Sequence, residues 1–165
     1  MTRKKDFIKP KTVEKALSEC YNLGTREVGF YATGEPLINK KLEKYILLAK
    51  NIGYKYIYLT TNGILADKDR IDKLFQNGLD SLKFSINAID SETYKTIHGT
   101  DNFNIVVKNL QNAYNLKKEK YKDKRISVSY IMTKYSIESK ENIQEFFKNI
   151  SDEVIVDMAK NQGGL

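Results

Sequence analysis

The chain has 165 residues, of which 41% are hydrophobic, so its length and apolar content suit one domain with a single core. It carries 28 Lys and Arg against 21 Asp and Glu, and much of the net charge of +7 lies in "TRKK" at 2–5 and "KKEKYKDKR" at 117–125. No apolar run approaches the roughly 18 residues of a membrane span, and the amino terminus lacks a signal-peptide core, so we expect a cytoplasmic protein.

Residue types that carry thiol or imidazole chemistry are scarce. Cys20 is the only cysteine and His98 the only histidine, which excludes an intramolecular disulfide framework and argues against a His-based triad or metal site. We expect Cys20, within "VEKALSECYNL", to be a structural helix residue and not a metal ligand. The basic runs alone leave two interpretations open: solvated helix ends and loops, or contact with nucleic acid or an anionic surface.

Apolar periodicity and turn residues predict helix followed by strand five times along the chain. We expect helices at 12–23, 39–52, 67–78, 104–118 and 139–149, and strands at 26–32, 54–62, 79–88, 125–133 and 152–159. The expected helix N-caps are Asn39, Asp67 and Ser139. Three helices are followed by a glycine that can end them, namely Gly24, Gly53 and Gly78. The segment "DSETYKTIHGTDNF" at 90–103 is predicted to be a longer connection.

The spacing and the side-chain alternation of the strands predict the fold class. The first three strands recur at roughly 27-residue intervals, typical of βα units that form a parallel sheet. Alternate strand residues separate into an apolar set and a polar or aromatic set. The apolar set includes Val28, Phe30, Ile57, Leu59, Leu82, Phe84 and Ile86; the polar set comprises Tyr31, Thr33, Glu35, Tyr56, Tyr58, Thr60, Asn62, Ser81, Lys83, Ser85, Asn87, Ser127 and Ser129. A doubly wound sheet is apolar on both faces. The polar face therefore predicts an α/β fold, an incomplete (β/α) TIM-like barrel with about five parallel strands and a wet concave interior.

Three strand ends carry polar motifs: "TGEP" at 33–36, "TTNG" at 60–63 and "SINA" at 85–88. Each alone has an ordinary structural explanation, since Pro36 and Gly63 punctuate turns, and Thr60 and Ser85 suit a strand. The carboxyl ends of consecutive parallel strands lie at one edge of a sheet, where α/β folds assemble their ligand sites. Their joint placement therefore predicts a ligand site at that edge.

In this order the motifs resemble the core of the radical S-adenosylmethionine (radical SAM) enzymes. The matching stretches are "VGFYATGEPLINKKLEKYILLAKNIGYKYIYLTTNG" and "GLDSLKFSINAIDSETYKTIHGTDNFNIVVKNL", and the likeness covers about residues 11–133. "SINAIDSETYKTIHG" is most similar to the branch whose members often carry an additional carboxyl-terminal iron–sulfur domain and modify peptides, cofactors or sugars. The resemblance implies that a [4Fe-4S] cluster donates an electron to S-adenosylmethionine, whose cleavage gives a 5′-deoxyadenosyl radical that abstracts hydrogen from a substrate.

The resemblance also implies cofactor-binding roles for nine residues. Thr33, Gly34, Glu35 and Pro36 occupy the family's Gly-Gly-Glu-Pro site, which holds the methionine ammonium group, with Thr33 in place of the first glycine. A carboxylate, exposed strand-end carbonyls and a close backbone approach suit an ammonium group. Ser85, with Asn87 beside it, matches the position that contacts the ribose or the methionine carboxylate. The remaining expected contacts are Thr61 and Asn62, as neighbouring polar groups, and Ile131, in the adenine-supporting region. None is expected to act as a general acid or base.

The family holds its cluster through the thiolates of a Cys-x3-Cys-x2-Cys loop after the first barrel strand, and this sequence has neither that strand nor that motif. We interpret 1–165 as a single partial radical SAM domain that lacks the first strand, the cluster loop and the carboxyl-terminal part. The parent would use an external electron donor and act on an unidentified substrate. The isolated chain is expected to be inactive and to self-associate through exposed sheet edges. A relative that has lost its cluster remains the other explanation.

Two other functions fit parts of the sequence. One is a cluster-free, barrel-like scaffold that binds a nucleotide-like ligand or an anionic partner. The other is an aldolase-type barrel with a Schiff-base lysine, for which Lys83 is the candidate. Lys83 lies early in its strand, so a solvated or paired lysine is the expected alternative.

Overall fold

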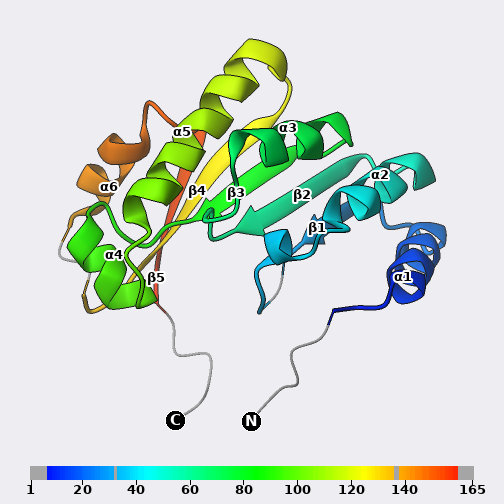
Figure 1. The fold of residues 1–165 in the computed structure, drawn as a ribbon, viewed down its shortest axis with the longest axis horizontal. Helices are drawn as coiled ribbons and strands as arrows, with labels where there is room; N and C mark the ends of the chain where they lie inside the picture. Colours follow the sequence, from blue (N-terminus) through cyan, green and yellow to red (C-terminus); the bar gives the residue numbers. More distant parts are fainter. Residues whose placement is uncertain (1–6, 32, 136–137, 160–165) are drawn as a thin grey trace, which may run out of the picture.

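The computed structural model describes residues 7–31, 33–135 and 138–159. Helices and strands alternate along the chain, which confirms the predicted α/β class (Figure 1). The helical elements are α1 (Pro10–Asn22), the 3-10 helix η1 (Pro36–Ile38), α2 (Leu42–Ile52), α3 (Lys68–Gln76), α4 (Ser91–His98), α5 (Phe103–Lys120) and α6 (Lys140–Phe147). The strands are β1 (Glu27–Phe30), β2 (Tyr56–Thr61), β3 (Ser81–Ser85), β4 (Arg125–Met132) and β5 (Glu153–Met158).

The strands form one sheet in the order β1-β2-β3-β4-β5, and every neighbouring pair is parallel. Figure 1 shows α2, α3 and α5 along the sheet, with α1 and α6 toward its two ends. The strand order equals the chain order, as in a barrel in which each helix returns the chain to the next strand. Five parallel strands arranged in this way confirm the prediction of an incomplete TIM-like barrel.

The two faces of the sheet differ in burial as the alternation predicts. In β2, Ile57 and Leu59 are fully buried, whereas Tyr58 and Thr60, which alternate with them, are only partly buried. β3 repeats the pattern, with Leu82 and Phe84 in the core. Burial of these large side chains against the helices supplies much of the stabilisation, at about 25 cal/mol per Å² of apolar surface removed from water. The opposite face, which we call the inner face, carries the polar and aromatic residues.

Carboxylates hold the amino ends of two strand pairs in the same way. Asp80, directly before β3, accepts a hydrogen bond from the Ile57 amide at 2.9 Å and one from Lys124 Nζ at 2.9 Å. Asp152, directly before β5, accepts from the Ile126 amide at 2.8 Å and from Lys117 Nζ at 2.6 Å. We call these two arrangements the aspartate clamps.

Several details of the predicted elements differ from the structure. Asn39 does not cap α2, because α2 begins at Leu42 after Lys41, and the Asn39 side chain instead accepts from the Lys41 amide at 2.9 Å. The segment 90–103 is not a plain connection, since it contains α4, capped by Asp90 through the Thr93 amide. The helix predicted at 104–118 begins one residue earlier and continues to Lys120. Asp67 and Ser139 cap α3 and α6 as predicted.

Among the described helices, none has both the length and the apolarity that crossing a membrane requires.

Candidate functional site

A cleft of about 320 Å³ lies at the carboxyl ends of β1, β2 and β3, near the lower end of the ~300–1,000 Å³ range of small-molecule sites. Six of the nine predicted site residues line it: Thr33, Gly34, Glu35, Thr61, Asn62 and Ser85. Tyr31 and Thr60 complete the lining. The fold thus brings the three motifs, which are separated by more than 20 residues in the sequence, to one place.

Glu35 ties the end of β1 to the end of β2. Its Oε1 accepts hydrogen bonds from the Leu37 amide at 2.9 Å and from the Thr61 hydroxyl at 2.7 Å, and its Oε2 accepts from the Asn62 amide at 2.7 Å. An ionised carboxylate has about four lone-pair sites, so about one remains for a ligand. Glu35 is therefore first a positioning residue of the cleft, with limited capacity left for a cation.

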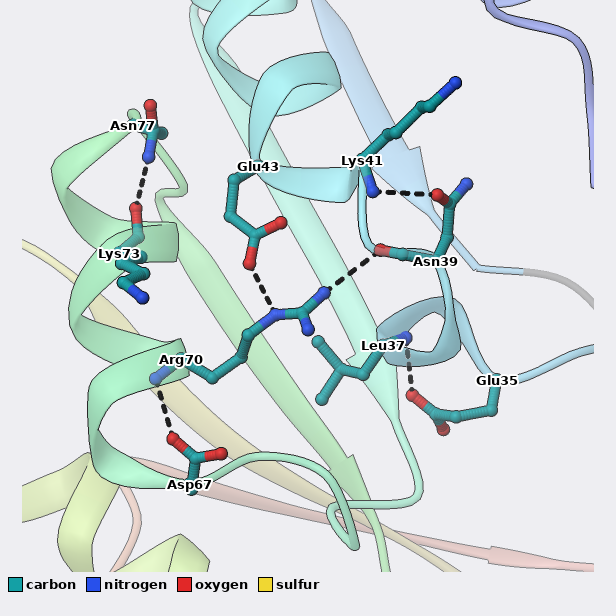
Figure 2. Close-up of polar contacts among 9 residues, drawn as sticks. All are labelled: Glu35, Leu37, Asn39, Lys41, Glu43, Asp67, Arg70, Lys73 and Asn77. Carbon is teal, nitrogen blue, oxygen red and sulfur yellow. Dashed lines mark hydrogen bonds and ion pairs between the residues drawn. The ribbon is translucent and has the colours of Figure 1, made fainter.

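The loop that carries Glu35 is braced from behind, as Figure 2 shows. Leu37 is 1% exposed and anchors η1 in the core. The guanidinium of Arg70 on α3 lies 2.5 Å from a Glu43 carboxylate oxygen and donates to the Asn39 carbonyl at 3.0 Å. Because Arg70 and Glu43 are only about one-fifth exposed, solvent screens this contact less than it screens a surface ion pair.

The loop after β2 is held by the conformation of Gly63 and by a hydrogen bond from Asn109. Gly63 has φ +81°, and a Cβ there would lie 2.7 Å from the Phe84 ring, so only glycine fits without a shift. Asn109, buried on α5, donates to the Gly63 carbonyl at 2.9 Å. This contact holds Asn62 at the cleft, although the sequence around Asn109 contains no motif that would have revealed it.

Gly34 leaves open space at the cleft. A Cβ built on Gly34 meets no heavy atom within 4 Å, and its backbone is not in the positive-φ region. The space beside it is therefore available to a ligand and is not filled by the protein's own packing.

The other three predicted site residues lie apart from the cleft lining. Pro36 begins η1 and fixes the chain direction after Glu35. Asn87 Oδ1 accepts a hydrogen bond from the Ile131 amide at 2.9 Å, which joins the ends of β3 and β4. Asn87 and Ile131 therefore bond to each other and do not line this cleft.

Tyrosines of the inner face adjoin the cleft. The ring centroids of Tyr31 and Tyr58 lie 5.7 Å apart, and those of Tyr58 and Tyr56 lie 5.9 Å apart. The pKa of Tyr58 is raised, mainly by a hydrogen bond with Tyr31 and to a lesser extent by burial. Gly29 makes room for the rings, since a Cβ there would lie 2.5 Å from the Tyr58 ring. The alternation in the sequence placed Tyr31 on this face but did not identify it as a site residue.

The residues of the cleft suit an organic zwitterion better than a metal cluster. They offer carbonyl, carboxylate, hydroxyl and amide groups, which are the partners of ammonium, carboxylate and ribose groups. An iron–sulfur cluster needs thiolates. Cys20 is exposed on α1, and the described residues contain no group of three His, Cys, Asp or Glu side chains that could hold a metal ion. The described residues fit S-adenosylmethionine and do not fit the cluster.

Comparison with known proteins identifies relatives of part of this chain. A curated relative, the probable GTP 3′,8-cyclase of Saccharolobus islandicus (strain Y.N.15.51 / Yellowstone #2), is 39% identical over 80 residues, which are 48% of this chain and 26% of the relative. The probable GTP 3′,8-cyclase of Methanococcus vannielii is 37% identical over 95 residues, which are 58% of this chain and 31% of the relative. The chain therefore spans about a quarter to a third of the length of these relatives.

A solved structure shares the fold. Streptococcus suis SuiB bound to S-adenosylmethionine superimposes with a TM-score of 0.79 at 20% identity, over 98% of this chain and 36% of SuiB. Residues 1–150 match the sequence profile of the Radical SAM superfamily, a family that uses S-adenosylmethionine and a [4Fe-4S] cluster. With the match covering most of the sequence, the chain belongs to the Radical SAM superfamily.

Proposed function

We propose that the strand-end cleft holds S-adenosylmethionine through its methionine and ribose groups. The observation that carries the proposal is the constellation around Gly34, where open space adjoins the Glu35 carboxylate at the ends of three parallel strands. The ammonium group would contact the remaining lone pair of Glu35 and the strand-end carbonyls of Thr33 and Gly34. Among described residues, neither of these two carbonyls accepts a backbone hydrogen bond.

Other residues at the strand ends would contact the ribose, the methionine carboxylate and the adenine. The Ser85 hydroxyl and the Asn62 side chain would contact the ribose or the methionine carboxylate, with Thr61 acting through Glu35. Asn87, next to Ser85 on the same face, would assist at the ribose or methionine carboxylate, and Ile131, whose amide bonds Asn87, would support the adenine. The chain's own residues bind and orient the cofactor in this scheme, and none transfers a proton. Reductive cleavage to a 5′-deoxyadenosyl radical is the chemistry that the cofactor supplies.

The activity of the whole protein is part of the same proposal. The chain would be one partial radical SAM domain of a longer enzyme whose cluster is held by cysteines outside 1–165, with an external electron donor. The location would be cytoplasmic, where thiols stay reduced. The substrate is unidentified. The solved complex of SuiB with its precursor peptide SuiA, which matches 96% of this chain with a TM-score of 0.77 at 19% identity, makes a peptide one candidate class.

Gly34 provides the test of the cofactor site. In Gly34→Leu the new side chain should enter the open space, so the thermal midpoint of the free protein should stay unchanged while S-adenosylmethionine binding is lost. Lys108→Leu, which adds the same side chain on the exposed surface of α5, is the matched control. Isothermal titration measures the affinity of each variant. Equal affinity of wild type and Gly34→Leu would refute the site.

A second titration separates the cofactor from other nucleotides. If ATP binds the wild type as tightly as S-adenosylmethionine and competes with it, the cluster-free nucleotide-binding scaffold is the better account. Preference for S-adenosylmethionine over S-adenosylhomocysteine and ATP supports the proposed cofactor.

A further inference from the structure

Lys83 lies at the centre of the inner face. It stands in the middle of β3 and is in register with Thr60 of β2 and Ser127 of β4. Ser85, the next residue of β3 on this face, lines the cleft and is in register with Ser129. Lys83 is thus one row deeper in the partial barrel than the cleft, and Thr60 belongs to both places.

The Lys83 ammonium group has no protein partner among the described residues. Every ion pair of the described residues involves other basic side chains, and no hydrogen bond from Lys83 Nζ is present. On the same face, Arg125 and Glu153 neutralise each other at 3.0 Å. Glu27 and Asp157, also on this face, lie on β1 and β5, each separated from β3 by one strand. Glu35, at the cleft, already accepts three hydrogen bonds from the protein. Lys83 is therefore an uncompensated positive charge on a partly buried surface.

Residues with hydroxyl side chains flank Lys83 on both neighbouring strands. Thr60, Ser127, Ser85 and Ser129 lie beside or next to Lys83 in the register, and none of their hydroxyls bonds another described residue. Hydroxyls rotate and can all donate to a single acceptor. A cation with unused hydroxyl donors on neighbouring strands is the arrangement that binds an oxyanion, since charge-assisted hydrogen bonds are the strong ones.

We propose that Lys83, with Thr60 and Ser127, binds an anionic oxygen group of the substrate, a carboxylate or a phosphate. The inference rests on the proposed function, because it places this group directly beneath the cofactor cleft, where a substrate would meet the radical. It specifies a substrate that carries a negative charge close to the reacting carbon. The Lys83 amine serves as a binding group and forms no covalent bond.

The experiment uses the 165-residue chain and nuclear magnetic resonance of its backbone amides. Inorganic phosphate and acetate are titrated separately at constant ionic strength, with chloride as the screening control. We expect saturable shifts of the amides of Thr60, Lys83 and Ser127. In Lys83→Met the anion affinity should fall about tenfold or more, the equivalent of one charged hydrogen bond, and Lys83→Arg should retain it. Lys108→Met, on the outer surface of α5, should bind like the wild type. The tighter of the two anions identifies the class of substrate group.

A parallel titration with S-adenosylmethionine keeps this inference distinct from the proposed function. The anion site is refuted if phosphate and acetate bind Lys83→Met as tightly as they bind the wild type. It is also refuted if the anions bind neither protein. If Lys83→Met weakens S-adenosylmethionine equally and the anions compete with it, Lys83 belongs to the methionine carboxylate and the substrate assignment is wrong. If wild type binds the anions but not S-adenosylmethionine, the proposed function fails and the anion site stands.

Discussion

Glu35 shows how one side chain can serve both the fold and a ligand. Its carboxylate accepts from Leu37, Thr61 and Asn62, so it replaces main-chain bonds that two neighbouring strand ends cannot make to each other. The sequence led to Glu35 because "TGEP" follows a predicted strand and matches the strand-end pattern of the radical SAM enzymes. It could not reveal that most of the carboxylate's capacity is used within the protein, since Thr61 and Asn62 are distant in the chain.

Substitution of Glu35 should therefore change stability as well as binding. Glu35→Gln turns one acceptor oxygen into an NH₂ group that faces a donor, and we expect the unfolding free energy to fall by about 2 kcal/mol. Urea denaturation measures this loss. Glu119→Gln, at an exposed acid of α5, should change it by less than about 0.5 kcal/mol. An unchanged midpoint in Glu35→Gln would show that the three hydrogen bonds do not hold the loop.

His98 gives the protein a defined response to pH. Its ring stacks on Tyr94 with centroids 4.3 Å apart, and its Nε2 is buried without a hydrogen-bond partner among the described residues. Burial lowers the pKa of His98. The unfolded chain therefore binds a proton at pH values where the folded chain does not, so stability falls as the pH drops through about 6.5.

As the only histidine, His98 can be tested without interference from another imidazole. The unfolding free energy of the wild type should fall between about pH 7.5 and 5.5, by at most about 1.4 kcal/mol per pH unit. His98→Phe keeps the aromatic stack without a titrating group, and its stability should be nearly constant over that range. Denaturant titrations at several pH values measure both proteins, and parallel profiles would contradict the assignment.

At the scale of elements, the aspartate clamps should carry a measurable share of the stability. Asp80→Ala leaves the Ile57 amide without its acceptor and leaves Lys124 with only its second partner, Asp123 at 3.3 Å, so we expect a loss of about 2–3 kcal/mol. Asp152→Ala should cost a similar amount through Ile126 and Lys117. Glu119→Ala serves as the surface control in thermal and urea unfolding. A cost near that of the control would mean that water replaces the carboxylate.

The elements that the sequence predicted are those with a strong alternation or a long apolar stripe. In β2, buried Ile57 and Leu59 alternate with polar neighbours, and the parity alone identifies the face. The sequence did not predict α4, because this helix has only eight residues and buries only Tyr94, so its apolar residues form hardly any helical periodicity. Asn39 was assigned to the wrong structure because an N-cap and a local turn use the same side-chain oxygen.

The site residues that the sequence did not predict form hydrogen bonds to residues that are distant in the chain. Arg70 reaches the Asn39 carbonyl 31 residues away, and Asn109 reaches the Gly63 carbonyl 46 residues away. Such contacts carry no local signal, because an arginine or asparagine on a helix is ordinarily a surface residue. The strand-end motifs were predictable because parallel strands bring their carboxyl ends together whatever the side chains are.

At the scale of the whole molecule, the sheet has two open edges among its described strands. β1 and β5 each pair on one side only, and the side chains of β1 are half-buried or exposed. An unpaired edge is a template for another strand. We expect self-association that rises with concentration between the micromolar and millimolar ranges, measured by sedimentation velocity. A single monomeric species throughout would contradict this prediction.

The aspartate clamps lie at one end of the strands and the cleft at the other, and this asymmetry bears on how the protein opens. The Ile57 and Ile126 amides, each bonded to a carboxylate, should exchange their hydrogens with solvent slowly, although positions near strand ends usually fray. Among the described residues, the carboxyl ends of the strands are held at Glu35, Gly63 and Asn87, but the space beside Gly34 is left open. Fluctuations would then begin at the cleft, so a ligand could enter or leave while the strands stay paired beneath it.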